Sequence, residues 1–163
     1  MPAARDPARP YAVALVCLGN ICRSPLAEAA LRAEAQRLGL DVEVDSAGTG
    51  DWHVGGPPDP RTVAVARRNG IDISHLRARQ VSADDFFRFD HIVALDAQNL
   101  ADMRALQPAG STARLSLLLD HVDGRAGEAV ADPYYGDDAA FDGAWADAAA
   151  GAGGLARLLA RQP

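Results

Sequence analysis

The stretch AVALVCLGNICRSP, from Ala12 to Pro25, decides the fold of this chain. Its first five residues are apolar, which is typical of a strand buried on both faces in a parallel sheet. Ser24 and Pro25 are residue types that start helices, at the cap and at the first helical position. The stretch therefore predicts a buried strand, a loop over residues 17–23 and a helix, the opening unit of an α/β protein.

Strand-like and helix-like segments alternate along the rest of the chain. We expect strands at about residues 11–16, 42–45, 91–95 and 114–119. We expect helices at about residues 24–38, 59–68, 96–106 and 139–161, with a short helix that holds Phe86 and Phe87. Gly and Pro mark 46–58 as a loop, and 120–138 forms a long acidic loop. The glycines between Gly151 and Gly154 predict a kink or break in the last helix, because each costs about 1 kcal/mol relative to alanine.

This order predicts a single-domain, doubly wound, flavodoxin-like α/β fold. Its four parallel strands lie in the order 2-1-3-4 with helices on both faces. Residues 1–10, rich in Pro, Ala and Arg, are predicted to be a disordered tail, and 11–163 form the domain. Ligands bind at the carboxyl ends of the strands in such a sheet. We therefore expect Cys17, Ser46 and Asp96 to face one crevice together with the acidic loop.

Composition excludes several classes of protein. The net charge of −6 argues against nucleic acid as a partner, and no apolar run reaches the ~20 residues that span a membrane. The start lacks the apolar segment of a secretory signal. The two cysteines lie in one loop and cannot build a disulfide framework, so a reducing, cytoplasmic setting is expected. The four histidines are scattered without metal-ligand spacing: His53, His75, His91 and His121.

The 17–23 loop has the chemistry of an oxyanion site. Gly19 permits a tight turn with inward amides, the helix start adds a positive field, and Arg23 offers two parallel donors. The same groups stabilise the thiolate of Cys17, the form that attacks. The alternatives are a buried structural thiol and a solvated arginine. Cys22 is expected to pack beneath the loop, close enough to Cys17 to form a disulfide after oxidation.

Several segments resemble one known family in the same order along the chain. VCLGNICRSPLAE, residues 16–28, resembles the signature of the low-molecular-weight protein tyrosine phosphatases. Five further segments fit that family: DSAGT at 45–49, WH at 52–53, ARQ at 78–80, ALDAQN at 94–99 and DPYYG at 132–136. The resemblance implies the same four-stranded sheet. It also implies a phosphatase that needs no metal or other cofactor.

The resemblance implies a two-step hydrolysis of phosphotyrosine. Cys17 attacks phosphorus to form a phosphocysteine, Arg23 holds the oxygens, and Asp132 protonates the leaving phenolate and later activates water. The alternative for Asp132 is an ordinary turn residue before proline. The other residues that bind the phosphate are Leu18, Gly19, Asn20, Ile21, Cys22 and Ser24.

The resemblance also assigns supporting and cleft residues. Ser24 would hydrogen-bond the Cys17 sulfur, cap the helix, or do both. Asn20 would hold the loop with Ser46 and His75, although His75 also fits a satisfied core histidine. The cleft that takes a phosphotyrosyl ring would be walled by Trp52, His53, Tyr134 and Tyr135.

Three alternative functions remain at this point. An arsenate reductase would need cysteines downstream of Cys22, and an arginine phosphatase of this family carries Thr where this chain has Ile21. A non-catalytic phosphopeptide-binding module would not need Cys17, Arg23 and Asp132 together. The predicted partners are a phosphotyrosine-containing protein and inhibitory phosphate-like oxyanions, and the predicted state is a monomer or weak oligomer.

Overall fold

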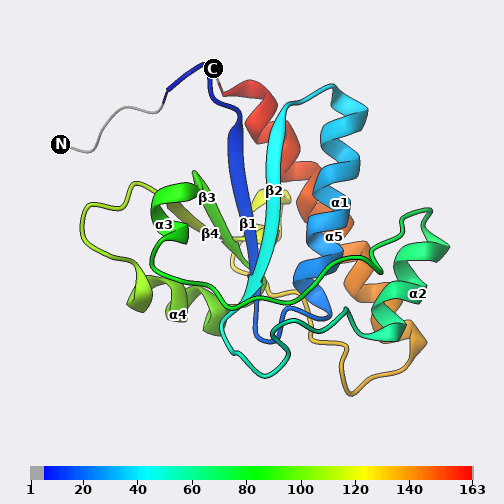
Figure 1. Cartoon of the computed structure of the whole chain (residues 1–163). Coiled ribbons are helices and arrows are strands. Elements are labelled where there is room, and N and C mark those ends of the chain that lie inside the picture. Colours follow the sequence, from blue (N-terminus) through cyan, green and yellow to red (C-terminus); the bar gives the residue numbers. More distant parts are fainter. Residues whose placement is uncertain (1–5, 163) are drawn as a thin grey trace.

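Four parallel strands form the centre of the computed structural model, which describes residues 6–162. The strands are β1 (Tyr11–Cys17), β2 (Val42–Gly48), β3 (His91–Ala94) and β4 (Arg114–Leu117). They lie in the order β2-β1-β3-β4, as Figure 1 shows, so the predicted sheet is confirmed. Cys17 pairs with Gly48 of β2, and Val16 pairs with Ala94 of β3. The carboxyl ends of these three strands therefore meet beside Cys17.

Helices cover both faces of the sheet, as predicted. They are α1 (Arg23–Leu38), α2 (Pro60–Arg68), α3 (Asp85–Arg88), α4 (Ala97–Leu106) and α5 (Asp138–Arg161), with a 3-10 turn, η1 (Leu118–His121). In Figure 1, α1 and α5 pack together on one face, and α3 and α4 lie on the other. Alternate β1 residues serve the two layers: Val13 and Leu15 join the α1–α5 core, while Ala14 packs with Phe86 on the opposite face.

The starts of α2 and α4 are capped by aspartate side chains, but the start of α1 is not capped by the serine expected there. Asp59 accepts a hydrogen bond from the Arg61 amide (2.8 Å), and Asp96 accepts one from the Asn99 amide (2.7 Å). In α1, however, Cys22 occupies the cap position without a side-chain bond, and Ser24 lies inside the helix. The prediction that Ser24 caps α1 is wrong because its hydroxyl is used in the site described below.

The predicted break in the last helix is also wrong. Helix α5 runs unbroken through Gly151 and Gly154. A Cβ at Gly154 would lie 1.8 Å from the carbonyl oxygen of His121, and one at Gly151 would lie 2.4 Å from Leu118 Cγ. Both glycines therefore let α5 press against η1. Although α5 has 24 residues, neither it nor another helix within residues 6–162 is apolar and long enough to cross a membrane.

The structure describes only the second half of the predicted tail, residues 6–10. Residues 1–5 of the predicted disordered tail lie outside the described residues. Residues 6–10 include a turn, and the Arg9 guanidinium donates to the Asp90 carboxylate at 2.7 Å. This part of the segment is therefore attached to the domain through the residue that precedes β3.

Candidate active site

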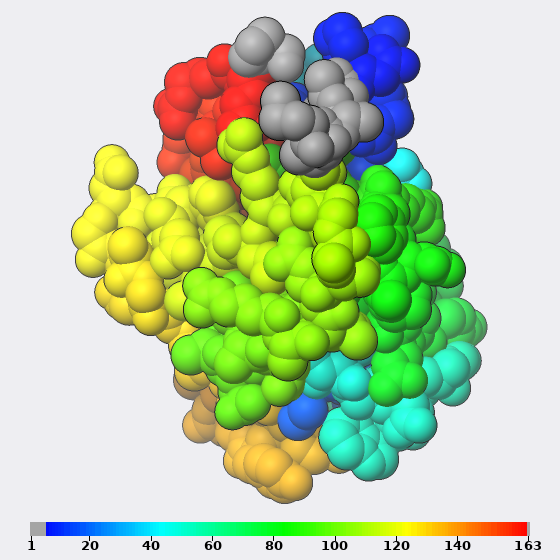
Figure 2. Space-filling view, turned by 90° about the vertical axis from the view of Figure 1, so that its left-hand side faces the viewer, coloured from blue at the N-terminus to red at the C-terminus, as the bar shows by residue number. Residues whose placement is uncertain are grey.

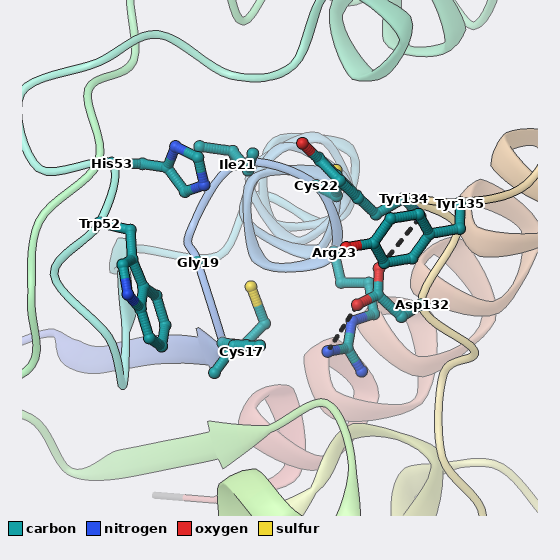
Figure 3. A pocket seen from close by; sticks show the side chains of 11 residues that line it. Cys17, Gly19, Ile21, Cys22, Arg23, Trp52, His53, Asp132, Tyr134 and Tyr135 are labelled. Atoms are coloured by element: carbon teal, nitrogen blue, oxygen red, sulfur yellow. Dashed lines mark hydrogen bonds and ion pairs between the residues drawn. The ribbon is translucent and has the colours of Figure 1, made fainter.

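Cys17 stands at the carboxyl end of β1 with its sulfur directed into a pocket. The residue is 3% exposed, and in Figure 3 its sulfur points to the space between Gly19 and Arg23. Cys17 Sγ and Ser24 Oγ lie 3.0 Å apart. Because Ser24 Oγ accepts a bond from the Asn20 amide (2.8 Å), its own proton is free to be donated to the sulfur. Ser24 can thus stabilise a thiolate at Cys17.

Asn20 fixes the shape of the loop. Its φ is 58°, the left-handed region that only a few non-glycine residues adopt. Its side-chain amide donates to Ser24 Oγ and to Ser46 Oγ (3.0 Å), and its carbonyl oxygen accepts from the Arg79 amide (3.0 Å). The predicted link of Asn20 to Ser46 is present in the structure, whereas its bonds to Ser24 and to the backbone amide of Arg79 were not predicted.

The loop carbonyls are bonded away from the pocket. The carbonyl oxygens of Cys17 and Leu18 accept from the amides of Thr49 and Gly50, each at 2.9 Å. This close approach requires Gly48, where a Cβ would lie 2.8 Å from the Leu18 carbonyl oxygen. Carbonyl dipoles directed outward leave the inner face of the loop suited to an anion.

A buried carboxylate, Glu28, supports the loop from below. Ser46 Oγ donates to Glu28 Oε1 at 2.5 Å, and Arg32 forms an ion pair with the same carboxylate. Burial raises the pKa of Glu28 above its usual value, against the opposing effects of Ser46 and Arg32. We did not predict this residue, since from the sequence it only lay in the first turn of a helix.

The predicted role of His75 in the loop is wrong. His75 is exposed, and within residues 6–162 no hydrogen bond joins it to the loop. The Arg79 amide supplies the third bond to Asn20 instead.

Arg23 is held between two carboxylates. The guanidinium is almost fully buried and donates to Asp96 Oδ2 (2.7 Å) and to the Val130 carbonyl oxygen (3.1 Å). Its other terminal nitrogen lies 3.8 Å from Asp132 Oδ2. Asp96 follows β3 and was expected in the crevice, but its role as a rear anchor for Arg23 was not predicted.

Asp132 lies on the opposite side of the pocket from Trp52 and His53 (Figure 3). Its side chain is 47% exposed, and Oδ1 accepts from the Tyr134 amide at 3.1 Å. Figure 2 shows the loop as a blue patch between the cyan segment around residue 50 and the orange segment around residue 135. The opening of the pocket is therefore flanked by these two segments.

Aromatic side chains wall this opening. Trp52, His53, Tyr134 and Tyr135 line the pocket together with Cys17 and the loop residues Leu18, Gly19, Ile21, Cys22 and Arg23. The two tyrosine rings meet edge to face, with centroids 4.9 Å apart. The predicted cleft residues are thus brought together around the sulfur.

Cys22 differs sharply from Cys17 in its surroundings. Both cysteines are free and buried. Burial is the main cause that raises the pKa of the Cys22 thiol to about 12. Cys22 is therefore a neutral thiol at physiological pH.

Arg61 links the loop carrying Asp132 to the rest of the site. Its guanidinium lies over the Tyr134 ring (5.5 Å to the centroid) and donates to the Gly136 carbonyl oxygen at 3.4 Å. It also forms an ion pair with Asp59 at 3.0 Å, and the Asp59 amide donates to the Ile21 carbonyl oxygen at 3.0 Å. This residue was not predicted, because from the sequence it appears as one of several arginines on a surface helix.

The family model of the low molecular weight phosphotyrosine protein phosphatases matches residues 12–162, and the chain belongs to this family. The family protein of Schizosaccharomyces pombe is 47% identical over 132 residues, covering 79% of this chain and 84% of that protein. No group of three or more His, Cys, Asp or Glu side chains in residues 6–162 could hold a metal ion.

Solved structures agree with this assignment. The crystal structure of YfkJ from Bacillus subtilis has a TM-score of 0.86 and 39% identity, covering 96% of this chain and all of that one (100%). A Drosophila arginine phosphatase, DARP, has a TM-score of 0.84 and 31% identity over 90% of this chain and 97% of that one. The fold thus also occurs in a phosphatase named for a different phosphorylated residue.

Proposed function

We propose that this chain hydrolyses phosphotyrosine in proteins, and small aryl phosphates, through a phosphocysteine intermediate. The observation that carries the proposal is the contact of the Cys17 sulfur with Ser24 at 3.0 Å, inside a pocket that also holds Arg23 and Asp132. A nucleophile, an oxyanion clamp and a proton donor around one cavity are the parts that phosphoryl transfer needs.

In the first step the Cys17 thiolate attacks phosphorus. The S–P bond forms as the bond from phosphorus to the phenolic oxygen breaks, and Asp132 gives its proton to that oxygen. Arg23 and the amides of the 17–23 loop stabilise the charge on the remaining phosphate oxygens. Asp96, at 2.7 Å, keeps the guanidinium aimed at the pocket.

In the second step water attacks the phosphocysteine. The carboxylate of Asp132 takes a proton from the water, and the new P–O bond forms as the S–P bond breaks. Inorganic phosphate leaves and Cys17 returns as the thiolate that Ser24 stabilises. Because the loop binds the product, phosphate and similar oxyanions are expected to inhibit.

The lining of the cleft suits a phenyl ring. Ile21, Trp52 and Tyr134 give the pocket apolar and aromatic walls, which suit stacking against a phosphotyrosyl ring. The likeness to DARP makes phosphoarginine the alternative substrate to test. Arsenate reduction lacks support because the chain has no cysteine beyond Cys22.

The decisive experiment compares phosphotyrosine, phosphoarginine and phosphoserine in one peptide sequence, with arsenate as a fourth substrate. We expect phosphotyrosine to be hydrolysed at least about a hundredfold faster, and Cys17→Ser to abolish turnover while leaving the fold intact. A preference for phosphoarginine would replace this function by the alternative. Full activity of Cys17→Ser would refute the mechanism.

We further propose that the pair Cys17 and Cys22 responds to peroxide. Oxidation of Cys17 to a sulfenic acid, followed by condensation with the Cys22 thiol and loss of water, would give a disulfide. A reducing compartment such as the cytoplasm, which keeps both thiols free, is the proposed setting. Mass spectrometry after mild peroxide tests this, and a sulfinic acid at Cys17 without a disulfide would contradict it.

A further inference from the structure

A second hollow opens beside the active-site pocket. We name it the side groove, and its walls include Ile21, Trp52, Val54, Pro57, Pro58 and Tyr134. Four residues line both the groove and the pocket: Ile21, Trp52, His53 and Tyr134. The groove is therefore a continuation of the active site along the segment 52–60.

The side groove exposes apolar surface to solvent. Trp52 is 69% exposed and Val54 is 57% exposed, and two prolines lie between them and α2. Apolar side chains exposed side by side in a hollow are a feature of contact sites. The one acidic residue in the groove, Asp59, is paired with Arg61 at 3.0 Å. The groove thus offers little to a charged ligand.

The groove walls are held in place before any ligand arrives. The amides of Gly55 and Ala78 donate to the carbonyl oxygens of Ala78 and Gly56, at 2.8 and 2.9 Å. The Trp52 ring packs closely on Gly50, where a Cβ would be 1.9 Å from the indole. A preformed wall loses little entropy on binding, which favours recognition.

We propose that the side groove binds an aliphatic or proline side chain that flanks the phosphotyrosine of the substrate. The inference rests on the proposed function, since the phosphate in the 17–23 loop sets where the peptide enters. A phosphotyrosyl ring between Trp52 and Tyr134 brings its neighbouring residues over Ile21, where the groove begins. Acidic flanking residues would instead meet the exposed carboxylate of Asp132, which lines the pocket.

The test uses phosphotyrosine peptides that differ only in the residues flanking the tyrosine: Leu, Val or Pro against Ser and Asp. We expect kcat/KM to be about tenfold higher for at least one apolar flank, the size of effect that one aliphatic contact gives. p-Nitrophenyl phosphate, which has no flanking residues, reports the basal reaction in parallel. Equal kcat/KM values across all the peptides would overturn the inference.

Val54→Asp is the diagnostic variant, because Val54 lines the groove but not the active-site pocket. It should remove the preference for apolar flanks and leave p-nitrophenyl phosphate turnover unchanged. The matched control is Phe87→Asp, at an equally exposed residue (61%) on α3, on the other face of the sheet (Figure 1). If the preference for apolar flanking residues survives Val54→Asp, or is lost equally in Phe87→Asp, the proposed role of the side groove is wrong.

The two proposals fail in distinguishable ways. If p-nitrophenyl phosphate and all phosphotyrosine peptides are left intact, the proposed function itself is wrong. If they are hydrolysed at normal rates without a flank preference, only the side groove is wrong.

Discussion

The guanidinium of Arg23 lies 3.8 Å from the carboxylate of Asp132, but only 2.7 Å from that of Asp96. The shorter contact is a direct hydrogen bond and the longer one is an ion pair at the open side of the pocket. Asp96 therefore anchors the arginine from the rear. The Asp132 carboxylate can give up its contact with Arg23 when a phosphate enters, and it can then act on the leaving group.

Asp132→Asn should slow the reaction mainly for poor leaving groups. The amide cannot give a proton to a phenolate, so hydrolysis of phosphotyrosine should fall by about 10²–10⁴-fold. p-Nitrophenolate leaves readily without a proton, and its release should fall far less. Steady-state rates on the two substrates check this, with Asp138→Asn in the first turn of α5 as the control. Equal slowing on both substrates would move the acid role to another residue.

Asn20 substitutions should separate the backbone strain from the hydrogen bonds. Asn20→Ala loses the side-chain bonds to Ser24, Ser46 and the Arg79 amide and keeps a non-glycine residue at φ 58°, which costs about 1–2 kcal/mol relative to glycine. Asn20→Gly loses the same bonds without that strain. Both should lower kcat about tenfold, whereas Gly should be the more stable of the two in urea unfolding. Higher kcat in Gly than in Ala would mean that the backbone angle, not Ser24, controls the sulfur.

Arg61→Ala should weaken the hold on the segment that carries Asp132. The variant loses the contacts with Tyr134, Gly136 and Asp59, and we expect kcat on phosphotyrosine to fall about three- to tenfold. The effect should be smaller on p-nitrophenyl phosphate, because the proton donor is what becomes misplaced.

Arg68→Ala is the matched control for that variant. Arg68 also lies on α2 and binds Asp142 of α5 at 2.8 Å, without touching the segment of Asp132. Its removal should leave both rates within about twofold. Equal losses in the two arginine variants would show that α2 matters only for stability.

Cys22 should make the fold less stable in alkaline solution. Its thiol keeps its proton up to about pH 12 in the native state but loses it near 9.0 when exposed. The unfolded chain therefore binds fewer protons between these values, and stability falls as pH rises through that window. From about pH 7.5 to pH 10 this contributes a loss of about 1.4 kcal/mol. Urea unfolding should show a smaller fall for Cys22→Ala than for the unchanged chain. An equal loss of stability in Cys22→Ala and in the unchanged chain would contradict this prediction.

Two glycines of α5 should respond oppositely to alanine. Gly143 is exposed and a Cβ there meets nothing within 4 Å, so Gly143→Ala should stabilise the fold by about 0.5–1 kcal/mol. Gly154→Ala would force a Cβ to 1.8 Å from the His121 carbonyl oxygen and should destabilise by more than that. Thermal or urea unfolding measures both. Stabilisation by Gly154→Ala would mean that α5 does not press on η1.

The parts of the fold that follow local rules could be predicted from the sequence. The apolar run of β1 and the alternation of strands and helices depend on neighbouring residues, and they were predicted correctly. The break expected in α5 failed because helix propensity is local, whereas the reason for Gly151 and Gly154 is a contact with a distant turn.

In the site, too, features set by neighbouring residues could be predicted and features set by distant contacts could not. Cys17, Arg23 and the loop come from one stretch, so their spacing identifies them. Glu28, Arg61 and Asp96 act through partners from 18 to 75 positions away, and nothing in their own surroundings indicates which partner the fold brings. The predicted role of His75 was wrong for a related reason, because the residues around it in the sequence do not show that the fold leaves its side chain exposed.

The fit of Leu118 against Gly151 implies that these two positions share one volume. The space that a Cβ at 151 would need is filled by the leucine, with its Cγ only 2.4 Å away. Chains with a larger residue at 151 should therefore carry a smaller one at 118, and a double variant should recover stability that either change alone would lose. The side-chain sizes at positions 118 and 151, which are 33 residues apart, are therefore expected to vary together among related chains.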